Sequence, residues 1–224
     1  MLNDLYERTP YEFEPLHATG WTARDARMAS RYLSSLPQAS RDAITEYTDK
    51  STDINLLLRK LYKGSNAADV ARDTTLIQNA LKGGGGLPHD TLLTRGDGSL
   101  WHFGLDEDET RELIRLGMAK SGAAQEILDG MSGEIITSAG FVSTSYVSTG
   151  APVSDIVVTS EKAVVKSEIA APSGMPAYDV TSISAEGTKE QEVLCAHGCS
   201  MLILNARVEN WQLILTQRMI LPHV

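Results

Sequence analysis

Residues 190–220, EQEVLCAHGCSMLILNARVENWQLILTQRMI, decide the class of fold, because short strand-like runs follow one another there with turn residues between them. His197-Gly198 fits a turn between the first two runs, and Glu209-Asn210 fits a hairpin turn between the last two. The three strands are expected at 190–196, 201–208 and 211–220. Upstream strands are expected at 91–95, 141–146, 155–160, 163–169 and 178–184.

The first third of the chain has helical periodicity instead. Thr22 and Asp25 form a capping-box pattern that predicts the start of a helix, and Pro37 ends that helix. Apolar residues then recur at helical spacing in several further segments. These helices are expected from Ser40 to Tyr47, from Thr52 to Gly64, from Asn66 to Gly83 and from Asp106 to Met118.

The order of these elements predicts an α+β fold, because helices precede the strands instead of alternating with them. We expect one domain over residues 1–224, mainly helical over 1–86 and mainly β over 87–224. Gly83–Gly86 is interpreted as a connector inside this domain. A phosphate-binding loop would need a preceding strand and a following Lys-Ser/Thr, and the sequence has neither.

Composition excludes several classes of protein. The 224 residues carry 20 Lys+Arg against 29 Asp+Glu, a net charge of −9, which disfavours a nucleic-acid or anionic-membrane partner. No apolar stretch approaches the length of a membrane span, and Met1–Pro10 has no apolar core typical of a signal peptide. Two cysteines cannot form a disulfide framework.

No metal site is predicted. Cys195, His197 and Cys199 alternate along the chain, but a structural zinc site wants four ligands and no second Cys/His pair lies nearby. Both cysteines are better interpreted as small core residues. The acidic cluster Asp106–Glu109 lacks the spacing of a calcium loop and fits the first turn of a helix.

Two glutamates in an E-x-E pattern are the first candidates for chemistry. Glu190 and Glu192 lie two residues apart on an expected strand, so they share one face. Paired carboxylates serve glycoside chemistry, where one stabilises a sugar cation and the other handles a proton. Taken alone, such a pair is more often a solvated surface feature.

A basic and a hydroxyl-rich motif precede that pair. In Leu92-Leu93-Thr94-Arg95-Gly96-Asp97, the planar guanidinium of Arg95 suits a bidentate grip on phosphate, or a simple ion pair with Asp97. In Phe141-Val142-Ser143-Thr144-Ser145, Ser143 and Ser145 share a strand face and offer hydroxyl groups. Neither motif is specific on its own.

Together and in this order, the three motifs resemble the arginine–serine–glutamate signature of the mono-ADP-ribosyltransferases, in particular the bacterial toxins and effectors with an E-x-E motif. The helical segments AITEYT at 43–48 and INLLLR at 54–59 are similar to the helix pair of that family. The resemblance runs from about Ala43 onward. It implies a helical part packed on two mainly antiparallel sheets that form a cleft for NAD.

The resemblance also implies roles for single residues. Arg95, with Gly96, would hold the phosphates or ribose of NAD, which is a substrate here. Ser143, with Thr144 and Ser145, would bind near the nicotinamide ribose, and Ser143 would orient Glu192. Glu192 would stabilise the cation formed as nicotinamide leaves. Glu190 would polarise the acceptor; in the family a Glu there goes with arginine targets and a Gln with asparagine or cysteine targets. Ser182–Lys189 would recognise the target protein.

The function implied is transfer of ADP-ribose from NAD to an arginine of a target protein, with release of nicotinamide. Two alternatives stay open: an NAD glycohydrolase with the same fold, and an inactive module that binds a partner protein. By resemblance, the chain would be a secreted toxin or effector that acts in the cytoplasm of a target or host cell, with a host or immunity protein as a further partner.

Overall fold

The computed structural model describes residues 20–146, 165–185 and 191–221. The expected strand at 155–160, the residue Glu190, and residues 186–189 of the expected recognition segment lie outside the described residues. The helices are α1 Ala23–Ser35, α2 Gln38–Asp49, α3 Thr52–Leu58, α4 Ala67–Gly83, α5 Glu107–Met118 and α6 Gly122–Met131, with a 3-10 turn at Trp101–Phe103. The strands are β1 Thr91–Asp97, β2 Ile135–Thr137, β3 Val142–Tyr146, β4 Val165–Ala171, β5 Ala177–Asp179, β6 Glu192–Cys195, β7 Ser200–Glu209 and β8 Gln212–Ile220.

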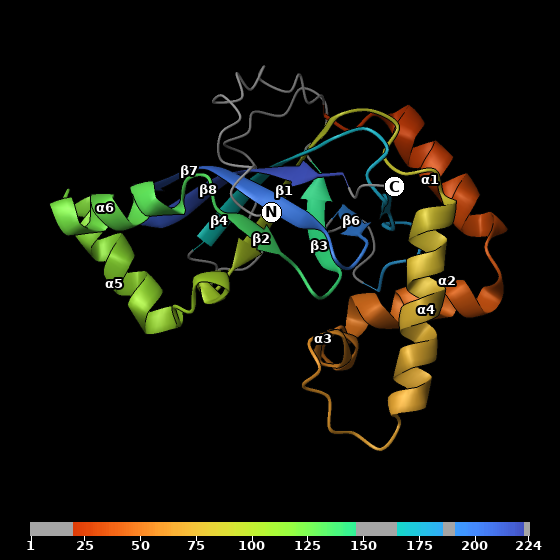
Figure 1. Cartoon of the computed structure of the whole chain (residues 1–224). Coiled ribbons are helices and arrows are strands. Elements are labelled where there is room, and N and C mark those ends of the chain that lie inside the picture. The colour runs from red at the N-terminus through yellow and green to blue at the C-terminus, as the bar shows by residue number, and fades with distance from the viewer. Residues whose placement is uncertain (1–19, 147–164, 186–190, 222–224) are drawn as a thin grey trace, which may run out of the picture.

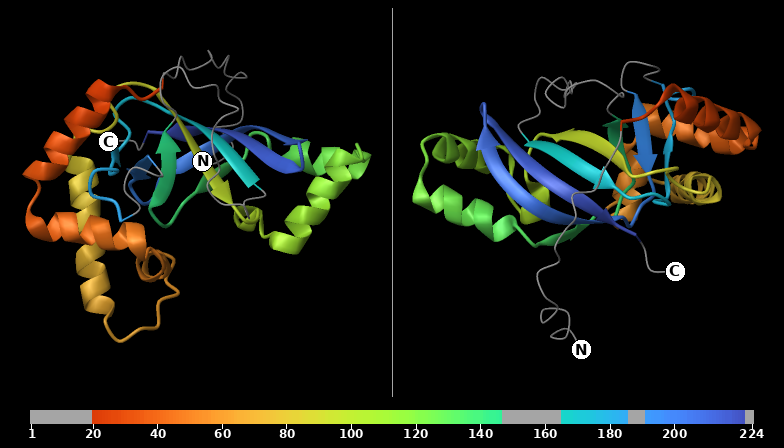
Figure 2. Two further views of the ribbon diagram at one scale, coloured as in Figure 1. Left: turned by 180° about the vertical axis from the view of Figure 1, so that it is seen from behind. Right: turned by 90° about the horizontal axis from the view of Figure 1, so that it is seen from above.

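The described strands form one eight-stranded sheet in the order β2-β7-β8-β4-β1-β3-β6-β5. All neighbours pair antiparallel except β4 and β8, which run parallel. The α+β class and the mainly antiparallel pairing are therefore confirmed, while the strands expected in two sheets share a single hydrogen-bonded order. Helices α1 to α4 gather beside the β6 end of this sheet, and α5 and α6 lie at the opposite end beside β7 (Figures 1 and 2).

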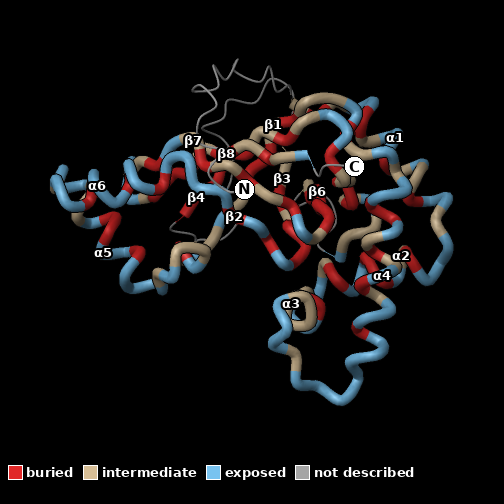
Figure 3. The backbone as a smooth tube through the Cα atoms, viewed as in Figure 1, coloured by how far each residue is buried: buried red, intermediate tan, exposed pale blue. Residues whose placement is uncertain are grey.

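Two apolar clusters hold the helices to the sheet. The larger cluster joins α1, α2 and α4 to the middle strands, with Ile44, Leu81, Leu93 and Leu194 almost fully buried. The smaller cluster lies under α5 and α6. Buried residues are concentrated along the strands of the sheet, and exposed residues along the outer faces of the helices (Figure 3). Within the described residues, none of the helices has both the length and the apolar character that a membrane crossing requires.

Several boundaries differ from the sequence expectations. Helix α2 begins at Gln38 with Pro37 as its N-cap, so the buried Ser40 does not cap it. The expected strand at 178–184 ends at Asp179, because the chain turns at Val180. The last hairpin turns one residue later than expected, at Asn210 and Trp211, which both have positive φ (50° and 62°).

The capping box at the start of α1 is confirmed, and its Asp25 also forms an ion pair with His89. Thr22 accepts a hydrogen bond from the Asp25 backbone, and the Asp25 carboxylate lies 3.1 Å from Nε2 of His89. Burial disfavours the charged forms of Asp25 and His89, but hydrogen bonds to these forms have the larger effect on both pKa values. The backbone of Asp90 and the Asp25 carboxylate raise the pKa of His89, while Thr22 and His89 lower the pKa of Asp25.

We expect His89→Gln to destabilise the protein in a pH-dependent way. The contribution of His89 is fully present below its ordinary pKa of 6.5 and is lost as the pH rises through its higher folded-state value. The contribution of Asp25 is present above its ordinary pKa of 3.8. The variant should therefore lose about 1 kcal/mol of unfolding free energy near pH 5.5 and less near pH 9, as measured by urea unfolding. An equal loss at both pH values would contradict this assignment.

Candidate active site

Three neighbouring strands bring Arg95, Ser143 and Glu192 together. Thr94 of β1 pairs with Ser145 of β3, and Ser145 pairs in turn with Glu192 of β6. Oγ of Ser143 donates a 2.7 Å hydrogen bond to Oε1 of Glu192. Nη1 of Arg95 donates a 3.0 Å hydrogen bond to the Ser143 carbonyl oxygen. The three residues therefore form one hydrogen-bonded group, in which Arg95 contacts the backbone of Ser143 and the Ser143 side chain contacts Glu192.

Arg95 also makes the ion pair that the sequence left open as an alternative. Its Nε lies 2.9 Å from Oδ2 of Asp97, and its Nη2 lies 2.8 Å from Oδ1. Burial opposes the charge of Arg95, but the Asp97 carboxylate outweighs it and raises the pKa of the guanidinium. The planar group is thus held on two sides, by Asp97 and by the Ser143 carbonyl. An arginine has five N–H groups, so some remain to bind a ligand.

Glu192 is only 3% exposed, although it carries a carboxylate. Its second oxygen, Oε2, accepts a 2.9 Å hydrogen bond from Oγ of Ser184, so a hydroxyl group contacts each carboxylate oxygen. Hydrogen bonds of this kind compensate for the loss of water around a buried charge.

The remaining expected site residues lie on the same strands but contact protein groups. Oγ1 of Thr144 donates to the Val193 carbonyl oxygen at 2.8 Å, which ties β3 to β6. The Ser145 carbonyl accepts a hydrogen bond from Thr94, and Gly96 pairs with Lys166 of β4. Arg95 and Ser143 line a pocket, whereas Gly96, Thr144, Ser145 and the buried Glu192 are not among the described residues that line it.

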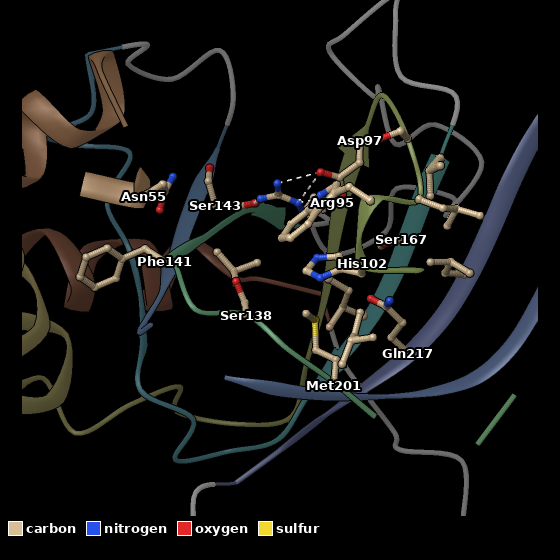
Figure 4. A pocket seen from close by; sticks show the side chains of 18 of the residues that line it. Asn55, Arg95, Asp97, His102, Ser138, Phe141, Ser143, Ser167, Met201 and Gln217 are labelled. Carbon is tan, nitrogen blue, oxygen red and sulfur yellow. Dashed lines mark hydrogen bonds and ion pairs between the residues drawn. The ribbon is translucent and has the colours of Figure 1, made fainter. Parts of the chain in front are cut away.

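That pocket has a volume of about 230 Å³. Asn55 and Ser143 lie on one side of Arg95, while His102, Ser167 and Gln217 lie on the other (Figure 4). Arg59 and Arg95 both line it, and Asp97 is the one carboxylate among the described lining residues. The pocket is thus cationic in a chain of net charge −9, which suits an anionic ligand.

Sequence reasoning gave no role to Asn55 and Arg59, although both belong to the INLLLR segment. The Arg59 guanidinium lies 4.5 Å from the ring centroid of Trp101, and no carboxylate pairs with it among the described residues. Nδ2 of Asn55 donates to the Tyr47 hydroxyl at 3.3 Å, while its Oδ1 is buried without a partner in the described part of the chain. Both residues fall in the helix expected from Thr52 to Gly64, at a spacing that places them on one face. That shared face could have marked them as a candidate pair for the site.

The pocket also holds a histidine that the sequence did not single out. Burial, together with the nearby charges of Arg95 and Arg59, lowers the pKa of His102 to about 4 against the opposing effect of Asp97. His102 is therefore neutral at physiological pH, and it adds no positive charge to the pocket.

The two cysteines are buried free thiols, as the sequence suggested, with His197-Gly198 in the turn between them. Burial raises the pKa of both, that of Cys199 to about 11, so neither is a thiolate near neutral pH. Across the described ranges, no group of three or more His, Cys, Asp or Glu side chains is placed to hold a metal ion.

Comparison with known proteins gives one family and many similar folds. A family model described as ADP-ribosyltransferase exoenzyme matches residues 18–222. The toxin Plx2a of Paenibacillus larvae is 22% identical with a TM-score of 0.69, and the match covers 88% of this chain and 93% of Plx2a. The Clostridium limosum C3 exoenzyme is 20% identical with a TM-score of 0.70, and the match covers 91% and 97% of the two chains.

A third similar structure contains a ligand. C3stau2 from S. aureus, solved with NAD, is 17% identical with a TM-score of 0.68, and the match covers 92% of this chain and 99% of C3stau2. Identities this low establish the fold alone. No curated protein sequence matches the chain significantly.

Proposed function

The chain belongs to the ADP-ribosyltransferase exoenzyme family, and from this premise we propose that it transfers ADP-ribose from NAD to an arginine side chain of a target protein. NAD is the substrate of such enzymes, and the solved C3stau2 structure contains it. The observation that carries the proposal is the bonded group of Asp97, Arg95, Ser143 and Glu192 beside a cationic pocket.

Glu192 supplies the charge that the reaction needs. The bond between nicotinamide and the ribose C1′ breaks, nicotinamide leaves with the bonding electrons, and the ribose becomes a cation. A carboxylate held next to that cation stabilises it more than it stabilises neutral ribose, which is the condition for catalysis. The Ser143 hydroxyl holds Oε1 of Glu192 and thereby fixes the direction of the carboxylate.

The pyrophosphate of NAD suits the two guanidinium groups of the pocket. Arg95 is oriented by Asp97, and Arg59 extends from the end of α3 toward the same space. A buried acceptor, Oδ1 of Asn55, adds a partner for a ribose hydroxyl or an amino group of the ligand. These contacts bind substrate and leave the chemistry to Glu192.

Arginine as the acceptor rests on Glu190, which lies outside the described residues. A guanidinium is a poor nucleophile until a base relieves it of a proton. A second glutamate two residues before Glu192 is the group that would accept this proton as the guanidine nitrogen attacks C1′. By its family, we further propose that the protein acts as a toxin or effector inside another cell.

The test is to incubate the protein with labelled NAD and a cell lysate, and to follow protein-bound label and free nicotinamide separately. Transfer to arginine predicts labelled protein whose label is released by hydroxylamine. Release of nicotinamide without labelled protein would contradict transfer and favour a glycohydrolase. The absence of both signals would contradict an enzyme.

We expect Arg95→Lys to weaken NAD binding. An ammonium group cannot hold Asp97 in two places, contact the Ser143 carbonyl and still face a phosphate, whereas the planar guanidinium can. The KM for NAD should rise about tenfold in a nicotinamide-release assay. Arg111→Lys, at an exposed ion pair on α5, is the matched control and should leave KM unchanged. The same KM in Arg95→Lys and wild type would remove Arg95 from the binding site.

A further inference from the structure

We propose that Ser184 is a positioning residue for Glu192, and that Thr45 and Thr48 of α2 hold Ser184 in place. The inference rests on the proposed function, in which Glu192 faces the ribose. It adds a part of the site that lies outside the arginine–serine–glutamate motifs. The residues that carry it come from α2 and from the turn that follows β5.

The need for a second hydroxyl follows from the shape of a carboxylate. The terminal torsion of a glutamate side chain is broad, so one hydrogen bond leaves the carboxylate plane free to swing. Ser143 bonds to Oε1 at 2.7 Å and Ser184 bonds to Oε2 at 2.9 Å. Because Ser143 on β3 holds one oxygen and Ser184 in the turn after β5 holds the other, the plane of the Glu192 carboxylate is fixed before substrate arrives.

Ser184 lies in a turn that is bonded to the backbone of Glu192. The Val180 N–H donates to the Glu192 carbonyl oxygen at 2.9 Å. The Val180 carbonyl accepts from the backbone N–H groups of Ile183 and Ser184, at 2.9 and 2.8 Å. Asp179 starts the turn by accepting the Thr181 N–H at 3.0 Å. The turn is therefore a built structure that presents Ser184 to Glu192.

Helix α2 anchors this turn on both sides of Ser184. Oγ1 of Thr45 donates to the Ile183 carbonyl oxygen at 2.7 Å. Oγ1 of Thr48 accepts from the Ala185 N–H at 2.9 Å and donates to the Thr45 carbonyl at 2.8 Å. The two threonines thus hold the residues before and after Ser184. Threonine is a modest helix former, so helix propensity does not explain the pair on one exposed face.

The expected signature is a loss of turnover with little change in binding. The orientation of Glu192 matters most when the ribose cation forms, so its loss acts on kcat more than on KM. We expect Ser184→Ala to lower kcat for NAD cleavage about tenfold, the size of a lost hydrogen bond to a charged group. KM should change by less than about twofold. Ser184→Thr, which keeps the hydroxyl, should restore most of kcat.

The α2 anchor is tested separately. Thr48→Val removes the hydroxyl at nearly constant shape, and it should lower kcat about threefold and speed hydrogen exchange of the Ala185 amide. Thr48→Ser should behave as wild type. Thr75→Val and Ser34→Ala are the matched controls, because the hydroxyls of both residues bond only within their own helices, α4 and α1.

The outcomes separate the two proposals. If wild type cleaves NAD and Ser184→Ala cleaves it with unchanged kcat, or with only KM altered, the positioning role is wrong and the proposed function stands. If Ala185 exchange is the same in Thr48→Val and wild type, the anchor is wrong, whatever the activity. If wild type cleaves no NAD, the proposed function fails and the positioning role fails with it.

Discussion

Glu192→Gln is expected to abolish both cleavage of NAD and transfer of ADP-ribose, with a fall in kcat of about 1,000-fold. The substitution keeps the size of the side chain and removes its charge. Glu192 is buried and held by Ser143 and Ser184. Asp97, the one carboxylate among the described residues lining the pocket, is paired with Arg95 and so does not replace the charge of Glu192. Release of nicotinamide from labelled NAD measures the effect directly.

Two further measurements make this result specific. Glu112→Gln removes the same charge from an exposed ion pair on α5, and it should retain full activity. The KM of residual Glu192→Gln activity should stay near that of wild type, because the pocket arginines still bind the phosphates. Residual kcat within about tenfold of wild type would contradict a catalytic role for Glu192.

Glu190→Gln is expected to separate the two activities. Transfer to a guanidinium acceptor should fall by about 100-fold, because no base then accepts the guanidinium proton. Cleavage of NAD with water as acceptor should continue, because the group that stabilises the ribose cation is intact. The assay compares label transferred to agmatine, a small guanidinium compound, with total nicotinamide released by the same sample.

A small acceptor isolates chemistry from recognition of a whole target protein. Glu209→Gln, at the exposed end of β7, controls for the change in net charge and should leave the ratio of transfer to hydrolysis unaltered. An equal loss of transfer and hydrolysis in Glu190→Gln would contradict the acceptor role. Undiminished transfer to agmatine would contradict it as well.

Strand pairing explains why the sequence could predict the meeting of Arg95, Ser143 and Glu192. Each residue lies in a short run with strong strand character, and motifs on neighbouring strands of a sheet are brought within bonding distance by the register alone. The fold class could be predicted for a similar reason, since the order of helices and strands limits the architecture.

Contacts that depend on turns and helix faces could not be predicted in this way. Ser184 was expected to lie in a strand, because nothing in the local sequence pattern marks the turn at Val180. A residue in that strand could not turn back onto Glu192. Thr45 and Thr48 bond to a segment more than 130 residues away in the chain. The sequence also did not predict helix α6, which glycines flank, since glycine is a poor helix former. Strand β2 was missed as well, because three residues are too few to show the alternation of a strand.

The place of β8 in the sheet has a consequence for the order in which the protein acquires its shape. Residues 212–220 pair with β7 on one side and run parallel to β4 on the other, so the strand translated after the other seven lies inside the sheet. Until it emerges from the ribosome, β4 lacks one neighbour and the half of the sheet with β2 and β7 is not joined to the half with β1 and β3. Such long-range closure is slow. The sheet, and with it the pocket that Leu215 and Gln217 of β8 help to line, is therefore complete only after residues 212–220 have been made.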